Sequence, residues 1–219
     1  MRMSNLIIFD MDDTLVGTHD LISASFAHAI AEYSRPRSSE NVAMISGYSL
    51  SCILLQSVPS DYLGEALERY HEYFETHFDQ SAQIYQSLKV TLTRLRKKGI
   101  DLAVLTGANR KWTEITLRES GLTSFFSVVL TSDDVKVPKP DPAGLIAIVT
   151  KLGAKTECTA YVGDEVKDIR SSRNAGVRAV GALWGSWERE KLKSAEPDVI
   201  LNEPIDLLRS KLVIGQSPE

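Results

Sequence analysis

Residues 6–14 read Leu6-Ile7-Ile8-Phe9-Asp10-Met11-Asp12-Asp13-Thr14, and this stretch determines the fold class that we predict for the chain. Its first four residues are apolar and include two β-branched side chains, a pattern typical of a strand buried on both faces, as in a parallel sheet. The run ends at Asp10, so carboxylates follow the strand directly. We therefore expect a buried strand that delivers acidic side chains to one edge of a sheet.

Short apolar runs of the same kind recur along the chain, with helical patterns between them. We expect further strands at residues 102–105, 128–130, 160–162 and 177–183, and helices at 88–99, 112–121, 141–153 and 165–175. Strands that alternate with helices in this way favour right-handed crossovers and a parallel sheet covered on both faces. The predicted fold class is α/β, with a doubly wound, Rossmann-like core. An edge strand at 198–201 and a last helix at 204–212 complete the expected elements.

Residues 17–87 interrupt this alternation. Apolar residues there follow helical spacing over 21–33 and 60–78, with Ser60 as a candidate N-cap, and none of the runs is typical of a strand. The sequence therefore predicts a helical cap domain inserted after the first strand. We place the α/β core at 1–16 and 88–219, and the cap domain at 17–87.

Composition narrows the classes of function. The 219 residues are 43% hydrophobic and 25% charged, with a formal net charge of −4. These values are ordinary for a globular protein and offer no basic surface for nucleic acid, while no apolar run is long enough to cross a membrane. Cys52 and Cys158 lack metal-type spacing, and we expect reduced, buried thiols. Since no signal segment is recognisable, we predict a cytoplasmic protein, as a monomer or homodimer.

Open α/β sheets bind ligands at the carboxyl ends of their strands, where this sequence concentrates its reactive groups. The candidates are Asp10, Asp12, Thr106, Gly107, Lys139, Asp164 and Asp168. Crowded carboxylates need a compensating cation, and an all-oxygen set favours Mg²⁺, which in turn points to a phosphate-bearing ligand. We expect Asp10 and Asp164 to bind the metal through carboxylates, Asp12 through its backbone carbonyl, and Asp168 from the outer shell.

Asp10 and Asp12 lie two residues apart after a strand, so their side chains can serve one pocket in two roles. Asp10 would attack phosphorus and form an aspartyl-phosphate, while Asp12 would act as general acid and then as general base. The phosphoryl oxygens would be held by the Thr106 hydroxyl, the Lys139 ammonium and backbone N–H groups near Met11, Asp12 and Gly107. The substrate would be a small phosphorylated metabolite.

Four motifs in order along the chain resemble those of the haloacid dehalogenase (HAD) superfamily. They are Asp-x-Asp-x-Thr at 10–14, Leu-Thr-Gly at 105–107, Pro-Lys-Pro-Asp-Pro at 138–142, and Gly-Asp-Glu-x-x-Asp at 163–168. The helical insertion resembles the type 1 cap of the subfamily that includes phosphoglycolate phosphatase, β-phosphoglucomutase and the haloacid dehalogenases. The resemblance implies a phosphatase similar to phosphoglycolate phosphatase, with the residue roles given above. It also implies that Gly47, Tyr48 and Ser49 of the cap contact the leaving group.

The chain departs from its relatives at several positions. Asp13 stands where they most often carry Gly, and we expect its side chain to point away from the site. Asp12 argues against a dehalogenase, which lacks this second aspartate. Ile22 and Leu50 occupy the places of the His and Arg of β-phosphoglucomutases, which disfavours a mutase.

Other interpretations stay open on the sequence alone. Phosphoryl transfer within a sugar phosphate is the alternative inside the family, and a non-catalytic phosphate-binding protein is the alternative outside it. Taken singly, Asp164 and Asp168 are also what a helix N-terminus prefers, and Lys139 is compatible with a surface lysine.

Overall fold

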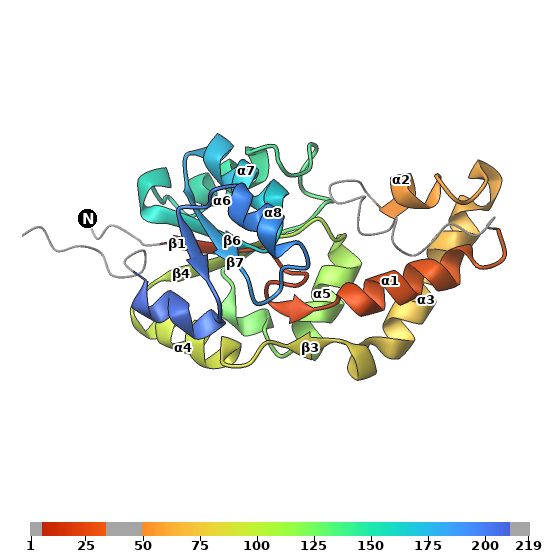
Figure 1. Ribbon diagram of the computed structural model, residues 1–219, viewed down its shortest axis with the longest axis horizontal. Helices are drawn as coiled ribbons and strands as arrows, with labels where there is room; N and C mark the ends of the chain where they lie inside the picture. The colour runs from red at the N-terminus through yellow and green to blue at the C-terminus, as the bar shows by residue number, and fades with distance from the viewer. Residues whose placement is uncertain (1–5, 34–49, 211–219) are drawn as a thin grey trace, which may run out of the picture. The chain divides into compact units, whose positions relative to one another are not determined.

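A computed structural model describes residues 6–33 and 50–210 (Figure 1). Contacts within the chain divide it into two compact units. The core unit comprises residues 1–16 and 84–219, and the helical unit comprises residues 17–83. The second boundary lies between Gln83 and Ile84, and the sequence-based one lies between residues 87 and 88.

The core unit is built on a six-stranded parallel sheet, which confirms the predicted fold class. The strand order is β5 (Val128–Leu130), β4 (Asp101–Leu105), β1 (Leu6–Phe9), β6 (Thr159–Gly163), β7 (Arg178–Ala182) and β8 (Val199–Leu201). β8 is the edge strand expected near residues 198–201. Strand β1 lies between β4 and β6, with Phe9 paired in register with both Val104 and Val162. The ends of these three strands therefore meet at one level of the sheet edge.

Helices connect the strands and cover both faces of the sheet. They are α4 (Leu88–Lys97), α5 (Arg110–Glu119), α6 (Ala143–Lys151), α7 (Val166–Ala175) and α8 (Arg189–Ser194), with 3₁₀ turns η4 (Thr123–Phe125), η5 (Thr156–Cys158) and η6 (Pro204–Arg209). The Ala143 N–H donates to Asp141 Oδ1 at 2.8 Å, so Asp141 helps to start α6, which begins two residues later than the predicted helix. The last expected helix is a 3₁₀ helix instead, which ends at Arg209.

Alternate residues of β1 face opposite sides of the sheet, and all four are buried. Leu6 and Ile8 belong to the same apolar cluster as Leu145 and Ile148 of α6. On α4, the leucines at 88, 92 and 95 are fully buried. Figure 1 shows α6 and α7 on one side of the sheet and α4 on the other. Burial on both faces explains why β1 is a continuous apolar run.

The helical unit contains α1 (His19–Ile30), α2 (Leu50–Leu54), η3 (Ser60–Tyr62) and α3 (Leu63–Ser81). Helix α3 buries Tyr70, Phe74 and Phe78, whose rings follow one another at centroid distances of 6.2 and 5.8 Å. Arg69 of α3 donates to the backbone carbonyl of His28 at 3.3 Å, which ties α3 to α1. The expected cap at Ser60 is wrong: the residue begins a 3₁₀ turn that has no side-chain capping bond.

Two short strands, β2 (Val16–Gly17) and β3 (Gln83–Ile84), form a separate two-stranded sheet where the chain leaves and re-enters the core unit. Neither cysteine forms a disulfide in the part of the chain that the structure describes, but the predicted burial is wrong: Cys52 is exposed, because the buried residue of the short helix α2 is Leu54, and Cys158 is half-buried. No helix within residues 6–33 and 50–210 combines the length and apolar character that crossing a membrane requires.

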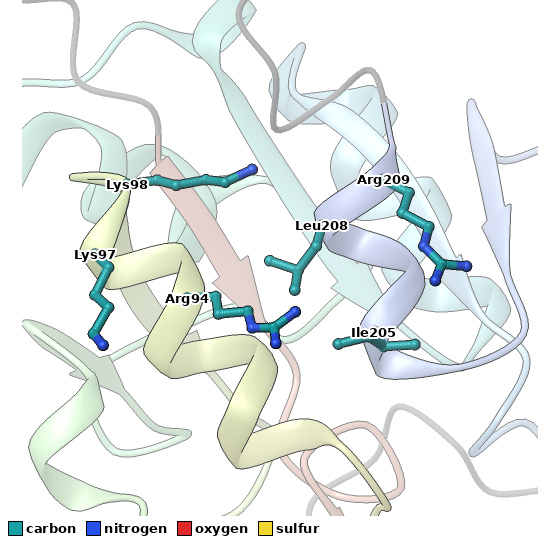
Figure 2. Close-up of a pocket in the computed structure, with 6 residues that line it drawn as sticks. All are labelled: Arg94, Lys97, Lys98, Ile205, Leu208 and Arg209. Carbon is teal, nitrogen blue, oxygen red and sulfur yellow. The ribbon is translucent and has the colours of Figure 1, made fainter.

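A cavity of about 420 Å³ lies between α4 and η6 (Figure 2). Its lining is basic around an apolar floor, and consists of Arg94, Lys97, Lys98, Ile205, Leu208 and Arg209. Helix α4 ends at Lys97 and β4 begins at Asp101, so this end of α4 lies at the amino edge of the sheet. The cavity is therefore remote from the carboxyl edge, where the candidate residues lie.

Candidate active site

The candidate residues follow the three central strands of the sheet. Asp10 continues β1, because its N–H donates to the carbonyl of Val162 at 2.9 Å. Thr106 follows β4 and is buried, while Asp164 directly follows β6. Because β1 lies between β4 and β6, these side chains start from adjacent positions on the same edge.

Lys139 joins two of the carboxylates in a buried ion pair network. Its Nζ lies 2.8 Å from Asp10 Oδ1 and 2.8 Å from Asp168 Oδ1. The three side chains are only 6%, 7% and 0% exposed, respectively. Lys139 is therefore a buried member of the site, and the interpretation of it as a surface lysine is wrong. Buried charges of this kind are costly unless they are paired, and here each is.

Tyr161 of β6 is the fourth side chain of this network. Lys139 Nζ donates to its hydroxyl at 3.0 Å, and the hydroxyl oxygen lies 3.2 Å from both Asp168 Oδ1 and the carbonyl of Leu105. Either of these two oxygens can accept the hydroxyl proton. Tyr161 is completely buried. It fixes the position of the ammonium group that faces Asp10.

Asp168 uses both carboxylate oxygens on protein partners. Oδ1 accepts from Lys139, and Oδ2 accepts from the backbone N–H of Glu165 at 3.0 Å. Glu165 and Asp168 together form a capping box at the start of α7. A side chain at Gly163 would collide with Asp168, since a Cβ there would lie 2.5 Å from its carboxyl group. Gly163 thus makes room for the carboxylate that holds Lys139.

Asp164 lies on the other side of the cluster and is buried. The Thr14 hydroxyl donates to its Oδ1 at 2.6 Å, which links the loop after β1 to the loop after β6. Oxygen atoms of Asp10, Asp164 and Asp168 lie within 4.8 Å of one another, a spacing that could hold a metal ion. The sequence alone gave Thr14 no role.

Burial and mutual repulsion shift the acidities of these groups. Burial raises the pKa of Asp10 to about 7, with Asp168 adding to the rise and Lys139 opposing it. Burial, Asp168 and Asp10 raise the pKa of Asp164 well above its usual value. Burial by itself would lower the pKa of Lys139, but Asp10 and Asp168 outweigh it and raise that pKa further. Asp10 and Asp164 thus resist ionisation in the metal-free site. A divalent cation such as Mg²⁺, bound by their oxygen atoms, would favour their charged forms.

The loop after β1 makes a tight turn. The Met11 carbonyl accepts from Leu15 at 2.9 Å, and the Asp13 N–H donates to Val16 at 2.7 Å. Asp13 has φ of 56°, in the left-handed region that favours glycine, which gives a physical reason for the glycine expected there in relatives. Gly185 packs so closely on the Asp13 backbone that a Cβ at 185 would collide with the Asp13 carbonyl. Asp12 is half-buried in this turn.

Several residues near the site went unrecognised in the sequence. Tyr161 sits in an apolar run and gave no signal of its hydroxyl's role. Tyr85, just after β3, lies close to the acidic turn: burial, Asp13, Asp164 and Asp12 all raise its pKa. Asp13 itself is buried, and its expected direction away from the site stays a prediction. Lys167 stands between Asp164 and Asp168 and pairs with Glu165.

Not all predicted site residues meet in the structure. It brings Asp10, Lys139, Asp164 and Asp168 together, and it places Thr106 on the neighbouring strand end, where its Oγ1 accepts from the Ala108 N–H at 3.0 Å. Gly107 is exposed beside it. The proposed cap contacts, Gly47, Tyr48 and Ser49, lie outside the described residues.

Comparison with known proteins agrees with this arrangement. The family described as haloacid dehalogenase-like hydrolase matches residues 7–182. Pyrophosphatases PpaX from Bacillus mycoides (strain KBAB4) and Anoxybacillus flavithermus (strain DSM 21510 / WK1) are each 34% identical over 205 residues, which cover 93% of this chain and 95% of each relative.

Solved structures give the same result for the fold. The crystal structure of a predicted phosphoglycolate phosphatase from Haemophilus somnus 129PT is 27% identical, with a TM-score of 0.84 over 95% of this chain and 98% of that one. A predicted phosphatase from Clostridium acetobutylicum shares the fold at 20% identity, with a TM-score of 0.79 over 97% and 100% of the two chains. The chain therefore belongs to the haloacid dehalogenase-like hydrolase family and groups with its phosphatases.

Proposed function

We propose that the protein is a Mg²⁺-dependent phosphatase that hydrolyses a small phosphorylated metabolite through an aspartyl-phosphate on Asp10. The observation that carries the proposal is the buried contact of Lys139 with Asp10 and Asp168, at 2.8 Å each, beside Asp164. A buried lysine between two carboxylates holds Asp10 in one position and supplies positive charge where a phosphoryl group would arrive.

The donor set fits Mg²⁺. Carboxylates of Asp10 and Asp164 and the carbonyl of Asp12 would hold the ion, which when bound would neutralise charge on the phosphoryl oxygens. Asp168 would act from the outer shell, because Lys139 and the Glu165 N–H already occupy its two oxygens. This division of roles keeps one acidic residue for the lysine and leaves the others for the cation.

The protein's own groups account for each bond that forms or breaks. An Asp10 oxygen attacks phosphorus, and the bond to the leaving oxygen breaks as Asp12 donates a proton to it. Asp12, now ionised, takes a proton from a water molecule that attacks the aspartyl-phosphate. Phosphate leaves and the Asp10 carboxylate is restored. Lys139, the Thr106 hydroxyl, and the N–H groups of Gly107 and the turn around Met11 would bind the phosphoryl oxygens throughout.

Two substrates suit this chemistry. A phosphomonoester similar to phosphoglycolate is our first choice, on the resemblance of the motifs and cap. Inorganic diphosphate is the second, because the relatives that are 34% identical over 93% of the chain are named pyrophosphatases. Phosphoryl transfer within a sugar phosphate is the weaker alternative, since Ile22 and Leu50 cannot supply the polar groups that a mutase places there.

We also propose that residues 17–87 form the cap domain, with Gly47, Tyr48 and Ser49 as its substrate contacts. The packing of α1 against α3 supports a compact helical body for this role. A cytoplasmic location and a monomeric or homodimeric state remain predictions from the sequence.

Phosphate release tests the proposal. We expect turnover of p-nitrophenyl phosphate and of at least one small phosphorylated metabolite in Mg²⁺, and none after chelation with EDTA. Asp10→Asn removes the nucleophile and should lower kcat by at least about a thousandfold. Asp79→Asn, an exposed aspartate on α3, is the matched control and should keep full activity. Undiminished turnover in Asp10→Asn would exclude Asp10 as the nucleophile, and tight binding of phosphorylated ligands without turnover would favour the non-catalytic alternative.

A further inference from the structure

Lys167 is a second lysine at the carboxyl edge of the sheet. It lies in the first turn of α7, three residues after Asp164 and one before Asp168. Its ammonium pairs with the Glu165 carboxylate, and 22% of its side chain is exposed. Lys167 is close enough to the nucleophile to lower the pKa of Asp10 and to interact with Lys139. Its charge therefore belongs to the electrostatics of the site.

The charges around Lys167 act on its ammonium in both directions. The N-terminus of a helix carries partial positive charge, which stabilises acidic residues and repels cations. Burial and the like charge of Lys139 also oppose the ammonium, but Glu165, Asp168 and Asp10 outweigh them and raise the pKa of Lys167. Within the described residues, Glu165 is its ion pair partner, whereas Lys139 has two carboxylates. Lys167 therefore stays charged, and an anion from solution would compete with Glu165 for its ammonium.

The exposure of the two lysines separates their roles. Lys139 is 6% exposed and faces the nucleophile, so it can reach only the phosphoryl group that Asp10 attacks. Lys167 is more exposed, at 22%, and its charge acts on both Asp10 and Lys139, so an anion from solution can reach it beside the nucleophile. Resting on the proposed function, we propose that Lys167 binds a second anionic group of the substrate, next to the phosphoryl group that is transferred.

Two kinds of substrate carry such a group. In inorganic diphosphate it is the second phosphate, and in phosphoglycolate it is the carboxylate. Phenyl phosphate has the same reacting group but no second anion. Lys167 therefore acts as a specificity residue that separates doubly anionic substrates from simple phosphomonoesters, and it exchanges its contact with Glu165 for one with the substrate.

The test compares three substrates in three forms of the full chain. In Lys167→Met, kcat/KM for diphosphate or phosphoglycolate should fall about 10- to 100-fold, chiefly through KM, as expected for one lost charged hydrogen bond. Phenyl phosphate should lose at least about threefold less, because its loss reports only the effect of Lys167 on Asp10, and Lys167→Arg should recover most of the loss. The substrate with the larger loss identifies the source of the second anion. Equal losses on all three substrates, or no loss on any, would overturn the proposal.

A matched control and a binding measurement distinguish a failure of the role proposed for Lys167 from a failure of the proposed phosphatase function. Lys191→Met removes an exposed lysine that pairs with Glu188 on α8, and should leave the substrate ratios unchanged. Calorimetry in Mg²⁺ needs no turnover: methylenediphosphonate should bind wild type more tightly than methylphosphonate, and Lys167→Met should abolish that preference. If phenyl phosphate and all other substrates resist hydrolysis, the proposed function fails while calorimetry still decides the role of Lys167. A preference that survives in Lys167→Met overturns the role of Lys167 alone.

A substitution of Glu165, the ion pair partner of Lys167, provides a further test of the proposal. Glu165→Gln keeps an oxygen that can cap α7 but removes the charge that competes with the substrate for Lys167. We expect a lower KM for the doubly anionic substrate in this variant, the opposite of the change in Lys167→Met. A KM that stays the same or rises would contradict an exchange between Glu165 and the substrate.

Discussion

The core unit and the helical unit bury different kinds of side chain. In the described part of the chain, the buried carboxylate and ammonium side chains all belong to the core unit: Asp10, Asp13, Lys139, Asp164 and Asp168. The helical unit buries aromatic and aliphatic side chains, with Tyr70, Phe74 and Phe78 along one face of α3. Burying charge opposes folding, whereas burying a phenyl ring favours it. The core unit therefore carries a cost in folding free energy that a catalytic role explains, and the described part of the helical unit, residues 17–33 and 50–83, carries none of that kind.

Removing Lys139 should have the largest effect on the free energy of unfolding, because it leaves buried carboxylates without a cation. Lys139→Met leaves Asp10 and Asp168 buried without their cation, and we expect the free energy of unfolding to fall by about 3 kcal/mol or more in the absence of metal. Urea denaturation followed by circular dichroism measures it. Lys136→Met, an exposed lysine in the same loop, is the control and should change stability by less than about 0.5 kcal/mol. Equal effects of the two variants would contradict the contrast between the units.

A cavity in the helical unit should act by packing alone. Phe74→Ala removes a buried ring from the middle of α3, at an expected cost of about 3 kcal/mol. Hydrogen exchange should show faster opening of amides in α1 and α3, with the amides of β1 and β6 unchanged. Phe74→Leu, which keeps most of the volume, should show a smaller effect. Loss of protection in the strands as well would mean that the two units unfold together.

The sequence predicted the core better than the details around it. Continuous apolar runs such as residues 6–9 identify buried parallel strands, because both faces are covered, and the six-stranded sheet confirmed them. The two-residue strands β2 and β3 were missed, since a pair so short has no periodicity to detect. The Ser60 cap was wrong because the chain enters α3 through a 3₁₀ turn rather than a capped start.

Some residues of the candidate site were also predicted from the sequence, and others were missed. Asp10, Asp164 and Asp168 were found because each follows a strand end, and such ends meet in space whatever the rest of the fold does. Tyr161 was missed because its side chain belongs to an apolar strand, and its partners Lys139 and Leu105 are 22 and 56 residues away in the chain. Lys167 was missed because only burial and the neighbouring Asp10 distinguish it from a solvated lysine on a helix.

Magnesium should bind the core unit in a pH-dependent manner. The pKa of Asp10 is raised from 3.8 to about 7, so the metal-free folded state holds a proton that the unfolded state releases, and stability falls as pH rises across this window. Mg²⁺ must displace that proton, so its affinity should weaken by roughly tenfold per pH unit below 7, or about 1.4 kcal/mol. Calorimetry at pH 5.5, 6.5 and 8 measures it. Asp10→Asn should flatten the dependence, and an affinity that is constant in wild type would contradict the raised pKa.

The smallest effect should come from the junction between the units. Ser87 has φ of 65° and ψ of −5° just before α4, a left-handed conformation that costs a non-glycine residue about 1 kcal/mol. Its carbonyl, which Gly also has, accepts from the N–H and the hydroxyl of Thr91, both at 2.9 Å. Ser87→Gly should therefore raise the free energy of unfolding by about 0.5 kcal/mol, after the greater entropy of the unfolded glycine chain is subtracted.

Ser87→Ala provides the control for that substitution, because it removes the hydroxyl but keeps the strained backbone. Ser87→Ala should not raise the free energy of unfolding in thermal or urea denaturation. A rise equal to that of Ser87→Gly would show that loss of the hydroxyl, and not relief of the backbone at φ of 65°, causes the stabilisation. Asp13 has a similar backbone, with φ of 56°, but lies in the acidic turn of the site. If Ser87→Gly leaves the rate of phosphate release unchanged, the strained backbone at Ser87 has no role in activity. The strain at Asp13 then stands apart, because Asp13 lies in the turn that directly follows Asp10 and Asp12, the proposed nucleophile and general acid.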